Sequence, residues 1–223
     1  MIYHSNQVNL MDYKIIVALD TNNLKKAKKL IKTLWLRVKF FKIGLELINT
    51  GKAPELIKYI NKLGGKVFYD IKLNDIPNTV GRTVKVISRL GVWGFTIHAL
   101  AGQEAIRAAV HNKGRSKVIG VTILTSSSAS VSKILQLVRI LAKEGVDGVV
   151  CSAREASVVK RFGLKIITPG IRPKWAQKND QKRTAIPKEA ITAGSDYLII
   201  GRPITDSANP LEALIKIIEE TET

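Results

Sequence analysis

The sequence predicts an α/β protein that folds as a single-domain TIM (β/α)8 barrel. Eight short runs rich in β-branched residues alternate with eight longer stretches that have the period of an amphipathic helix. The short runs are apolar on both faces, as in parallel strands that helices cover. Eight such units are the number that closes a parallel sheet into a barrel. An open doubly wound sheet is the alternative, but no Gly-x-Gly-x-x-Gly motif follows the first run, which continues as ALDTNNLKKA.

The expected strands and helices alternate along the chain from residue 14 onward. The strands are KIIVAL (14–19), VKFFKI (38–43), KVFYDI (66–71), WGFTIH (93–98), KVIGVT (117–122), GVVC (148–151), KIIT (165–168) and YLII (197–200). The helical patterns lie at 23–34, 53–63, 77–90, 102–112, 129–145, 153–162, 186–194 and 209–220. We expect the barrel domain to span residues 13–223, preceded by a disordered N-terminal extension at residues 1–12.

The composition is strongly basic, with 36 Lys and Arg residues against 18 Asp and Glu residues and a formal net charge of +18. The basic residues are scattered, and in LKKAKKLIKTLW the lysines occupy the polar face of an amphipathic helix. No RNA-recognition, zinc-finger or helix-turn-helix signature accompanies them. We therefore expect no specific nucleic-acid partner, and a nucleic-acid-binding module that uses the basic surface is the alternative from a different functional class.

Hydropathy and cysteine content indicate the compartment. No stretch approaches eighteen consecutive apolar residues, and the N-terminus lacks the charged-then-apolar layout of a signal peptide. We expect a cytoplasmic protein with no membrane partner. The single cysteine, Cys151, excludes an internal disulfide and is expected to be a small buried residue.

Charged side chains stand at the ends of the first three expected strands, where an apolar residue would be easier to bury. They are Asp20 in VALD, Lys42 in FKIG, and Asp70 with Lys72 in FYDIKL. Strand alternation puts Asp70 and Lys72 on one face, and the carboxyl ends of barrel strands share one mouth, where such barrels carry out chemistry. We interpret the four as an acid–base array, with a structural ion-pair network at the rim as the alternative.

The loops after the last two strands predict an anion site on the far side of the same mouth. They read TPGIRP and IIGRPI, with Gly170, Arg172, Gly201 and Arg202. Glycine lets backbone N–H groups approach a phosphate, and arginine supplies a bidentate fork. Residues 169–186 form a long irregular stretch of the kind that often serves as an active-site lid. Together these features predict a phosphorylated small-molecule substrate.

The segment DIKLNDIPNTV resembles the Asp-x-Lys-x-x-Asp-Ile-Pro-x-Thr signature of the orotidine 5′-phosphate decarboxylase family. The resemblance extends from IIVALD to IIGRPI, and VTILTSS, TPGIRP and DQKR occur in the order that this family has them. It implies a homodimer without cofactor or metal that converts orotidine 5′-monophosphate to UMP and carbon dioxide, the last step of de novo pyrimidine biosynthesis. It also implies catalysis by electrostatic stabilisation of a carbanion at C6.

The same resemblance implies a role for individual residues. The charged catalytic network would comprise Lys42, Asp70, Lys72 and Asp75 of the partner subunit, with Lys72 as the proton donor to C6. The substrate-binding residues would be Asp20 and Lys42 at the ribose, Ile76 and Thr79 across the dimer interface, Thr125 at the pyrimidine edge, Pro169 near the base, and Gln181, Gly201 and Arg202 at the phosphate.

The nearest alternative is a magnesium-dependent sugar-phosphate decarboxylase or aldolase that shares Asp-x-Lys-x-x-Asp. Such enzymes carry an acidic metal ligand at the end of the second strand, where this chain has Lys42. An ammonium group repels Mg²⁺ and has no lone pair to donate. His98 ends the fourth strand without a second histidine nearby, so we expect it to form hydrogen bonds at the rim rather than to bind a metal. Trp93 is expected to be an aromatic residue that faces the barrel or a helix.

Overall fold

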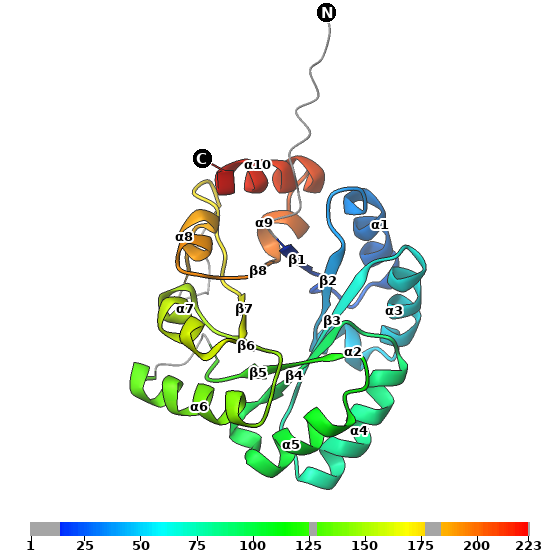
Figure 1. Ribbon diagram of the computed structural model, residues 1–223. Helices are drawn as coiled ribbons and strands as arrows, with labels where there is room; N and C mark the ends of the chain where they lie inside the picture. Colours follow the sequence, from blue (N-terminus) through cyan, green and yellow to red (C-terminus); the bar gives the residue numbers. More distant parts are fainter. Residues whose placement is uncertain (1–13, 125–128, 177–183, 223) are drawn as a thin grey trace, which may run out of the picture.

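A computed structural model of the chain describes residues 14–124, 129–176 and 184–222. Its strands are parallel and pair in sequence order, and β8 pairs with β1, which closes the barrel (Figure 1). The predicted single-domain (β/α)8 barrel is therefore confirmed. The predicted extension at residues 1–12 lies outside the described residues.

The eight strands lie where the β-branched runs predicted them, with ends that differ by at most two residues. Their bounds are β1 Lys14–Ala18, β2 Phe40–Ile43, β3 Lys66–Leu73, β4 Gly94–His98, β5 Lys117–Val121, β6 Gly148–Val150, β7 Lys165–Thr168 and β8 Tyr197–Ile200. The extension of β3 to Leu73 carries the strand past Asp70 and Lys72. Both charged residues therefore belong to the sheet itself, which fixes them more firmly than a loop would.

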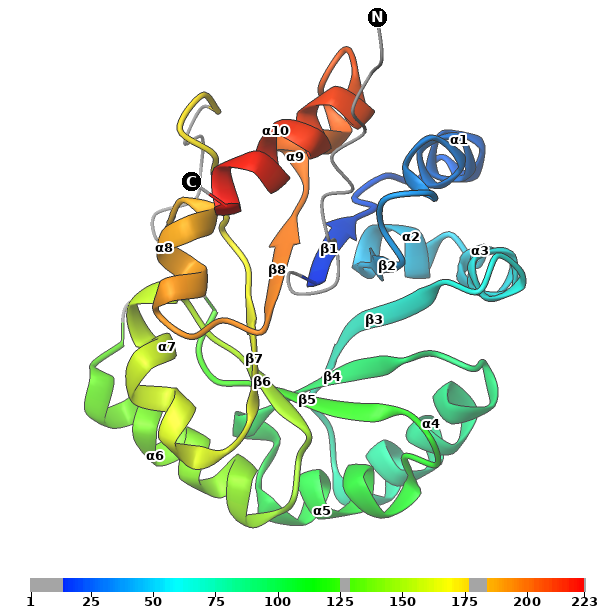
Figure 2. The ribbon, with the colours of Figure 1, turned by 45° about the horizontal axis from the view of Figure 1, so that its top comes forward.

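The helices form an outer layer around the strands (Figure 2). Eight of them correspond to the predicted patterns: α1 Leu24–Leu34, α3 Ala53–Lys62, α4 Pro77–Arg89, α5 Gln103–Asn112, α6 Val131–Lys143, α7 Ala153–Val159, α8 Pro187–Thr192 and α10 Pro210–Glu222. Two short helices, α2 Leu45–Asn49 and α9 Arg202–Thr205, were not predicted, because each is too short to show a helical period. Within the described residues no helix is long and apolar enough to cross a membrane.

Helix α1 shows how the basic composition is accommodated. Asn23 caps it, with its side-chain oxygen accepting a hydrogen bond from the backbone N–H of Lys26 at 3.0 Å. Ala27, Ile31 and Leu34 are buried against the barrel, one turn apart. The lysines between them face solvent, as the sequence pattern predicted.

The interior of the barrel is filled at the amino ends of the strands and open at the carboxyl ends. The Trp93 ring lies 5.2 Å from that of Phe40 and 5.1 Å from that of Tyr197, centroid to centroid, and 6.1 Å from that of Phe68. These rings pack with the inner aliphatic side chains of the strands, so Trp93 faces the barrel as expected. The aromatic packing confines any substrate to the opposite end.

Cys151 has the buried setting that the sequence predicted, and Gly120 makes a close contact that it did not predict. Cys151 is buried, and burial raises the pKa of its thiol to about 12, so the thiol stays protonated at neutral pH. Gly120 in β5 lies under Leu141 of α6, where a Cβ atom would come within 2.4 Å of a Leu141 methyl carbon. The close approach of α6 to the sheet therefore requires glycine at this position.

We predict that Gly120→Ala lowers the free energy of unfolding by about 1–3 kcal/mol, because the new methyl group overpacks a buried contact. Urea denaturation at equilibrium measures this loss. Leu141→Val in the Gly120→Ala background should restore part of the lost stability, although the same change destabilises the parent chain. Equal midpoints for Gly120→Ala and the parent chain would show that α6 shifts without cost.

Candidate active site

A cavity of about 230 Å³ opens at the carboxyl ends of the strands. Its polar lining comes from the ends of β1 to β3 and from the loops after β7 and β8, two groups that adjoin where β8 pairs with β1, and aliphatic side chains of β5, β6 and β8 line other parts of it. The polar lining residues are Asp20, Lys42, Asp70 and Lys72 in the first group, and Arg172 and Arg202 in the second. The cavity thus joins the two features that the sequence placed at the mouth.

The four charged residues at the carboxyl ends of β1 to β3 form a continuous alternating chain of ions. Lys42 Nζ lies 2.7 Å from Asp20 Oδ1 and 3.8 Å from Asp70 Oδ2. Lys72 Nζ lies 2.8 Å from the same Asp70 Oδ2. Lys42 and Asp70 are each only 9% exposed, so each charge requires its neighbours. The two ammonium groups and two carboxylates of this chain balance one another, so the net positive charge of the cavity lining comes from Arg172 and Arg202.

The structure adds one residue that the sequence analysis missed. Thr96 of β4 donates a hydrogen bond from its hydroxyl to Asp70 Oδ1 at 3.0 Å. The hydroxyl oxygen of Thr96 in turn accepts a hydrogen bond from the backbone N–H of Lys72 at 2.8 Å. Nothing in the sequence marks Thr96, because threonine is common in strands and WGFTIH reads as an ordinary apolar run.

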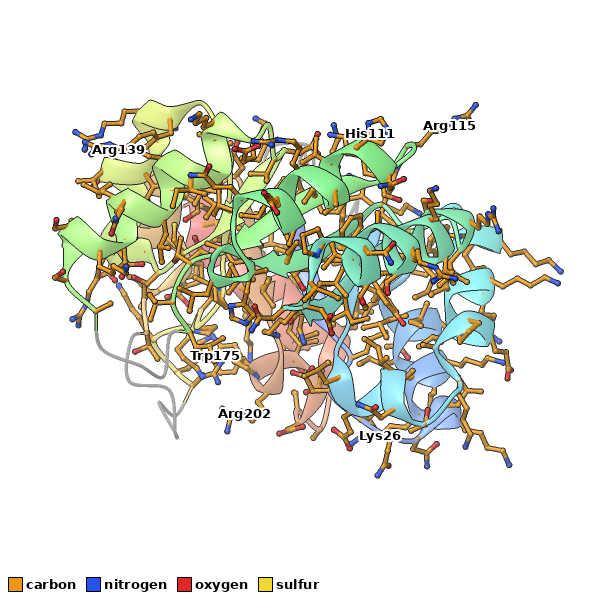
Figure 3. The ribbon with its side chains drawn as sticks, turned by 90° about the horizontal axis from the view of Figure 1, so that it is seen from below. Lys26, His111, Arg115, Arg139, Trp175 and Arg202 are labelled. Atoms are coloured by element: carbon orange, nitrogen blue, oxygen red, sulfur yellow. The ribbon has the colours of Figure 1, made fainter. Side chains whose placement is uncertain are left out.

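The other polar part of the rim is built from the loops that follow β7 and β8. Gly201 follows β8, and Arg202 begins α9 directly after it. Arg172 is buried, and its Nη1 donates to the backbone carbonyl of Ile171 at 3.0 Å. Arg202 and Trp175 lie at the same end of the barrel as Lys26, opposite the end that carries His111 (Figure 3). Two guanidinium groups and the backbone of two glycines can hold a phosphate here.

Comparison with known proteins shows to which family the chain belongs. Residues 13–217 match the model of the orotidine 5′-phosphate decarboxylase / HUMPS family. The chain belongs to this family. A curated orotidine 5′-phosphate decarboxylase of Syntrophomonas wolfei is 42% identical, covering 94% of this chain and 98% of the relative. Another, from Carboxydothermus hydrogenoformans, is 43% identical over 95% and 97% of the two chains.

Solved structures of the same family have the same fold as this chain. The orotidine 5′-phosphate decarboxylase of Lactobacillus acidophilus superposes with a TM-score of 0.82 at 33% identity, covering 95% of this chain and all of the other. That of Methanocaldococcus jannaschii, solved with the inhibitor BMP, has a TM-score of 0.78 at 25% identity, covering 95% and 99% of the two chains. The sequence-based prediction of an enzyme of the orotidine 5′-phosphate decarboxylase family is thereby confirmed.

Three of the predicted site residues do not face the cavity of the chain that carries them. Asp75 is exposed, and its Oδ1 accepts a hydrogen bond from the backbone N–H of Ile76 at 2.7 Å. Ile76 is 66% exposed, and Thr79, in the first turn of α4, is exposed as well. In the described part of the chain none of the three lines the mouth of the barrel that carries it. This placement fits residues that act on a neighbouring subunit.

The remaining predicted residues divide into those the structure places and those it does not. Pro169 and Gly201 line the cavity beside Arg202. Thr125 and Gln181 lie outside the described residues, as does part of the proposed lid. Their expected contacts with the pyrimidine and the phosphate stay predictions.

His98 does not form the hydrogen bond expected of it through Nδ1. This atom is buried without a hydrogen-bond partner among the described residues. Burial lowers the pKa of the imidazole, and the nearby Lys72 lowers it further against the opposing effect of Asp70. His98 is therefore neutral at pH 7. Within the described residues no three His, Cys, Asp or Glu side chains are grouped as a metal site requires.

Proposed function

We propose that this chain is an orotidine 5′-phosphate decarboxylase that converts orotidine 5′-monophosphate to UMP and carbon dioxide, the last step of de novo pyrimidine biosynthesis. The observation that carries the proposal is the ion chain Asp20–Lys42–Asp70–Lys72, which lines one cavity together with two arginines. The alternative, a magnesium-dependent sugar-phosphate decarboxylase or aldolase, would need an acidic metal ligand at the end of β2, where this chain has Lys42 paired with two carboxylates. A cation at this position favours decarboxylation without a metal.

The proposed chemistry requires stabilisation of an unusually unfavourable anion. When the C6–carboxylate bond breaks, the electron pair stays on C6, and no adjacent π-system spreads the charge. The Lys72 ammonium, held by Asp70 at 2.8 Å, is placed to stabilise that charge and then to donate a proton to C6. Enzymes supply up to ~23 kcal/mol of such differential stabilisation. Lys72 then regains its proton from solvent as the products leave.

Asp70 has a second proposed effect on the substrate. Its carboxylate would face the departing carboxylate of the bound substrate, and two unit charges ~4 Å apart repel by about 4 kcal/mol at an effective dielectric constant near 20. The repulsion is relieved as carbon dioxide leaves. Because Lys42 and Lys72 both pair with Asp70, this negative charge can persist in a nearly buried position.

The remaining substrate contacts follow from the two polar parts of the cavity lining. Asp20 and Lys42 would bind the ribose hydroxyls, since both line the cavity and form the end of the ion chain away from Lys72. Pro169 would pack near the base, with Thr125 at the pyrimidine edge. The phosphate would lie against Gly201 and Arg202, with Gln181 on the lid.

We further propose that the active form is a cytoplasmic homodimer, without a nucleic-acid or membrane partner. Asp75, Ile76 and Thr79 would complete the site of the partner subunit. Support comes from their exposure on the chain that carries them, and from the exposed apolar side chain of Ile76, which a subunit contact would bury.

The proposed activity predicts that the purified protein bleaches the ultraviolet band of orotidine 5′-monophosphate, with undiminished rate in excess EDTA. Keto-sugar phosphates, the substrates of the magnesium-dependent alternative, should not react. Absence of any spectral change at micromolar enzyme would refute the proposed function. Activity that EDTA abolishes would instead favour the metal-dependent branch.

Lys72→Ala should lower turnover by about 10²–10⁴-fold or more, because it removes both the proton donor and the charge beside C6. Binding of UMP should weaken much less, since UMP has no charge at C6. Steady-state kinetics and calorimetry measure the two effects. Lys28→Ala, which removes a surface lysine paired with Glu55, is the matched control and should retain wild-type activity. Equal losses in turnover and UMP binding would reduce Lys72 to a binding residue.

If Asp75 serves the partner's site, inactive Asp75→Asn chains mixed with inactive Lys72→Ala chains should regain activity. Each mixed dimer contains one site with both residues intact, so random exchange should restore about a quarter of the wild-type activity. Assays after subunit exchange, with exchange verified by mass spectrometry, measure the recovery. No recovery despite verified exchange would place Asp75 in the site of its own barrel.

A further inference from the structure

The backbone of β3 is irregular at the residues that carry the proposed catalytic charges. Tyr69 pairs with Phe95, and the next registered pair joins Leu73 to Ile97. Three residues of β3, 70–72, therefore face a single residue of β4, Thr96. Such a bulge leaves backbone groups without their usual ladder partners.

Lys72 also has a left-handed backbone conformation, with φ of +53°. It is the one residue other than glycine with positive φ in the described part of the chain. A lysine in this region of backbone space is strained by roughly 1–2 kcal/mol, and such strain persists only where the surroundings enforce it. Some contact must therefore hold Lys72 in place.

Thr96 provides that contact with a single hydroxyl group. The side chain is fully buried, and its oxygen accepts the Lys72 backbone N–H at 2.8 Å. The same hydroxyl donates a hydrogen bond to Asp70 Oδ1 at 3.0 Å, and Asp70 Oδ2 accepts a hydrogen bond from Lys72 Nζ at 2.8 Å. Both carboxylate oxygens are thus fixed from different sides, so the carboxylate cannot rotate away from Lys72.

We propose that Thr96 is the positioning residue of the active site, which sets the direction of the Asp70 carboxylate and the backbone from which Lys72 extends. This role rests on the proposed decarboxylase function. Thr96 does not line the cavity, and it acts only through Asp70 and Lys72. A hydroxyl group is small and can donate one hydrogen bond and accept another at the same oxygen atom. The bulge requires both, because the Lys72 N–H needs an acceptor and Asp70 Oδ1 needs a donor.

Three variants separate the hydroxyl from the rest of the side chain. Thr96→Val keeps the shape and removes both hydrogen bonds, whereas Thr96→Ser keeps the hydroxyl and loses only a methyl group. Thr122→Val is the matched control. Thr122, directly after β5, is equally buried, but its hydroxyl has no hydrogen-bond partner among the described residues.

Thr96→Val should lower kcat by about 10–100-fold, the usual effect of removing a group that orients functional side chains. KM and the affinity for UMP should change by less than about threefold, because the groups that contact ribose and phosphate stay in place. Thr96→Ser and Thr122→Val should both stay within about threefold of wild type in kcat. Steady-state kinetics and calorimetry are measured below the unfolding temperature of every variant.

Hydrogen exchange at the Lys72 amide, followed by NMR, tests the same proposal without any assay of activity. The amide should exchange slowly in wild type and in Thr96→Ser, and rapidly in Thr96→Val. If wild type fails to decarboxylate orotidine 5′-monophosphate, the proposed function falls and the exchange data still decide whether Thr96 holds the bulge.

Two results would overturn the proposal. Wild-type kcat in Thr96→Val would show that the hydroxyl is dispensable. A loss in Thr96→Ser as large as that in Thr96→Val would assign the effect to packing of the methyl group.

Discussion

The carboxylate of Asp70 is the group on which the arrangement at the mouth depends. It is almost completely buried, a position that an isolated charge does not tolerate, and it is held there by two lysines and one hydroxyl. Removing one member of a buried ion pair typically destabilises a protein by about 3–5 kcal/mol. Here the loss of Asp70 would leave two ammonium groups facing each other. The neighbouring strands must therefore be in register before the site can exist.

One end of the barrel is packed with apolar side chains, and the other end carries the candidate active site. At the amino ends the rings of Phe40, Trp93 and Tyr197 fill the interior, so that this end is closed by apolar packing. At the carboxyl ends the same strands terminate in charged or small residues around an open cavity. The apolar end contributes burial that offsets the desolvation of charges at the polar end. The fold tolerates the desolvation cost of a lysine or aspartate at a strand end because burial of the apolar rest of the strand offsets it.

The sequence was sufficient to predict the fold and the charged residues that meet at the carboxyl ends of its strands, for physical reasons. Runs such as KIIVAL and YLII specify buried parallel strands, and their spacing leaves room for one helix between each pair. Once a barrel is predicted, residues at strand ends such as Lys42 and Asp70 must converge. The bulge in β3 and the role of Thr96 were not predictable, because they depend on the register between strands more than twenty residues apart. The left-handed conformation of Lys72 has no sequence signal either, since lysine does not favour it.

The closure of the sheet between β8 and β1 constrains how this chain can meet another protein. Each of the eight strands is hydrogen-bonded on both sides, so the sheet offers no open edge to which a foreign strand could be added. Self-association by strand exchange or by edge-to-edge growth, a common route to aggregation, would first require the barrel to open. Contacts between copies through the described residues therefore involve helices and loops and not a strand edge. The segment from Asp75 to Thr79, at the start of α4, belongs to that accessible layer.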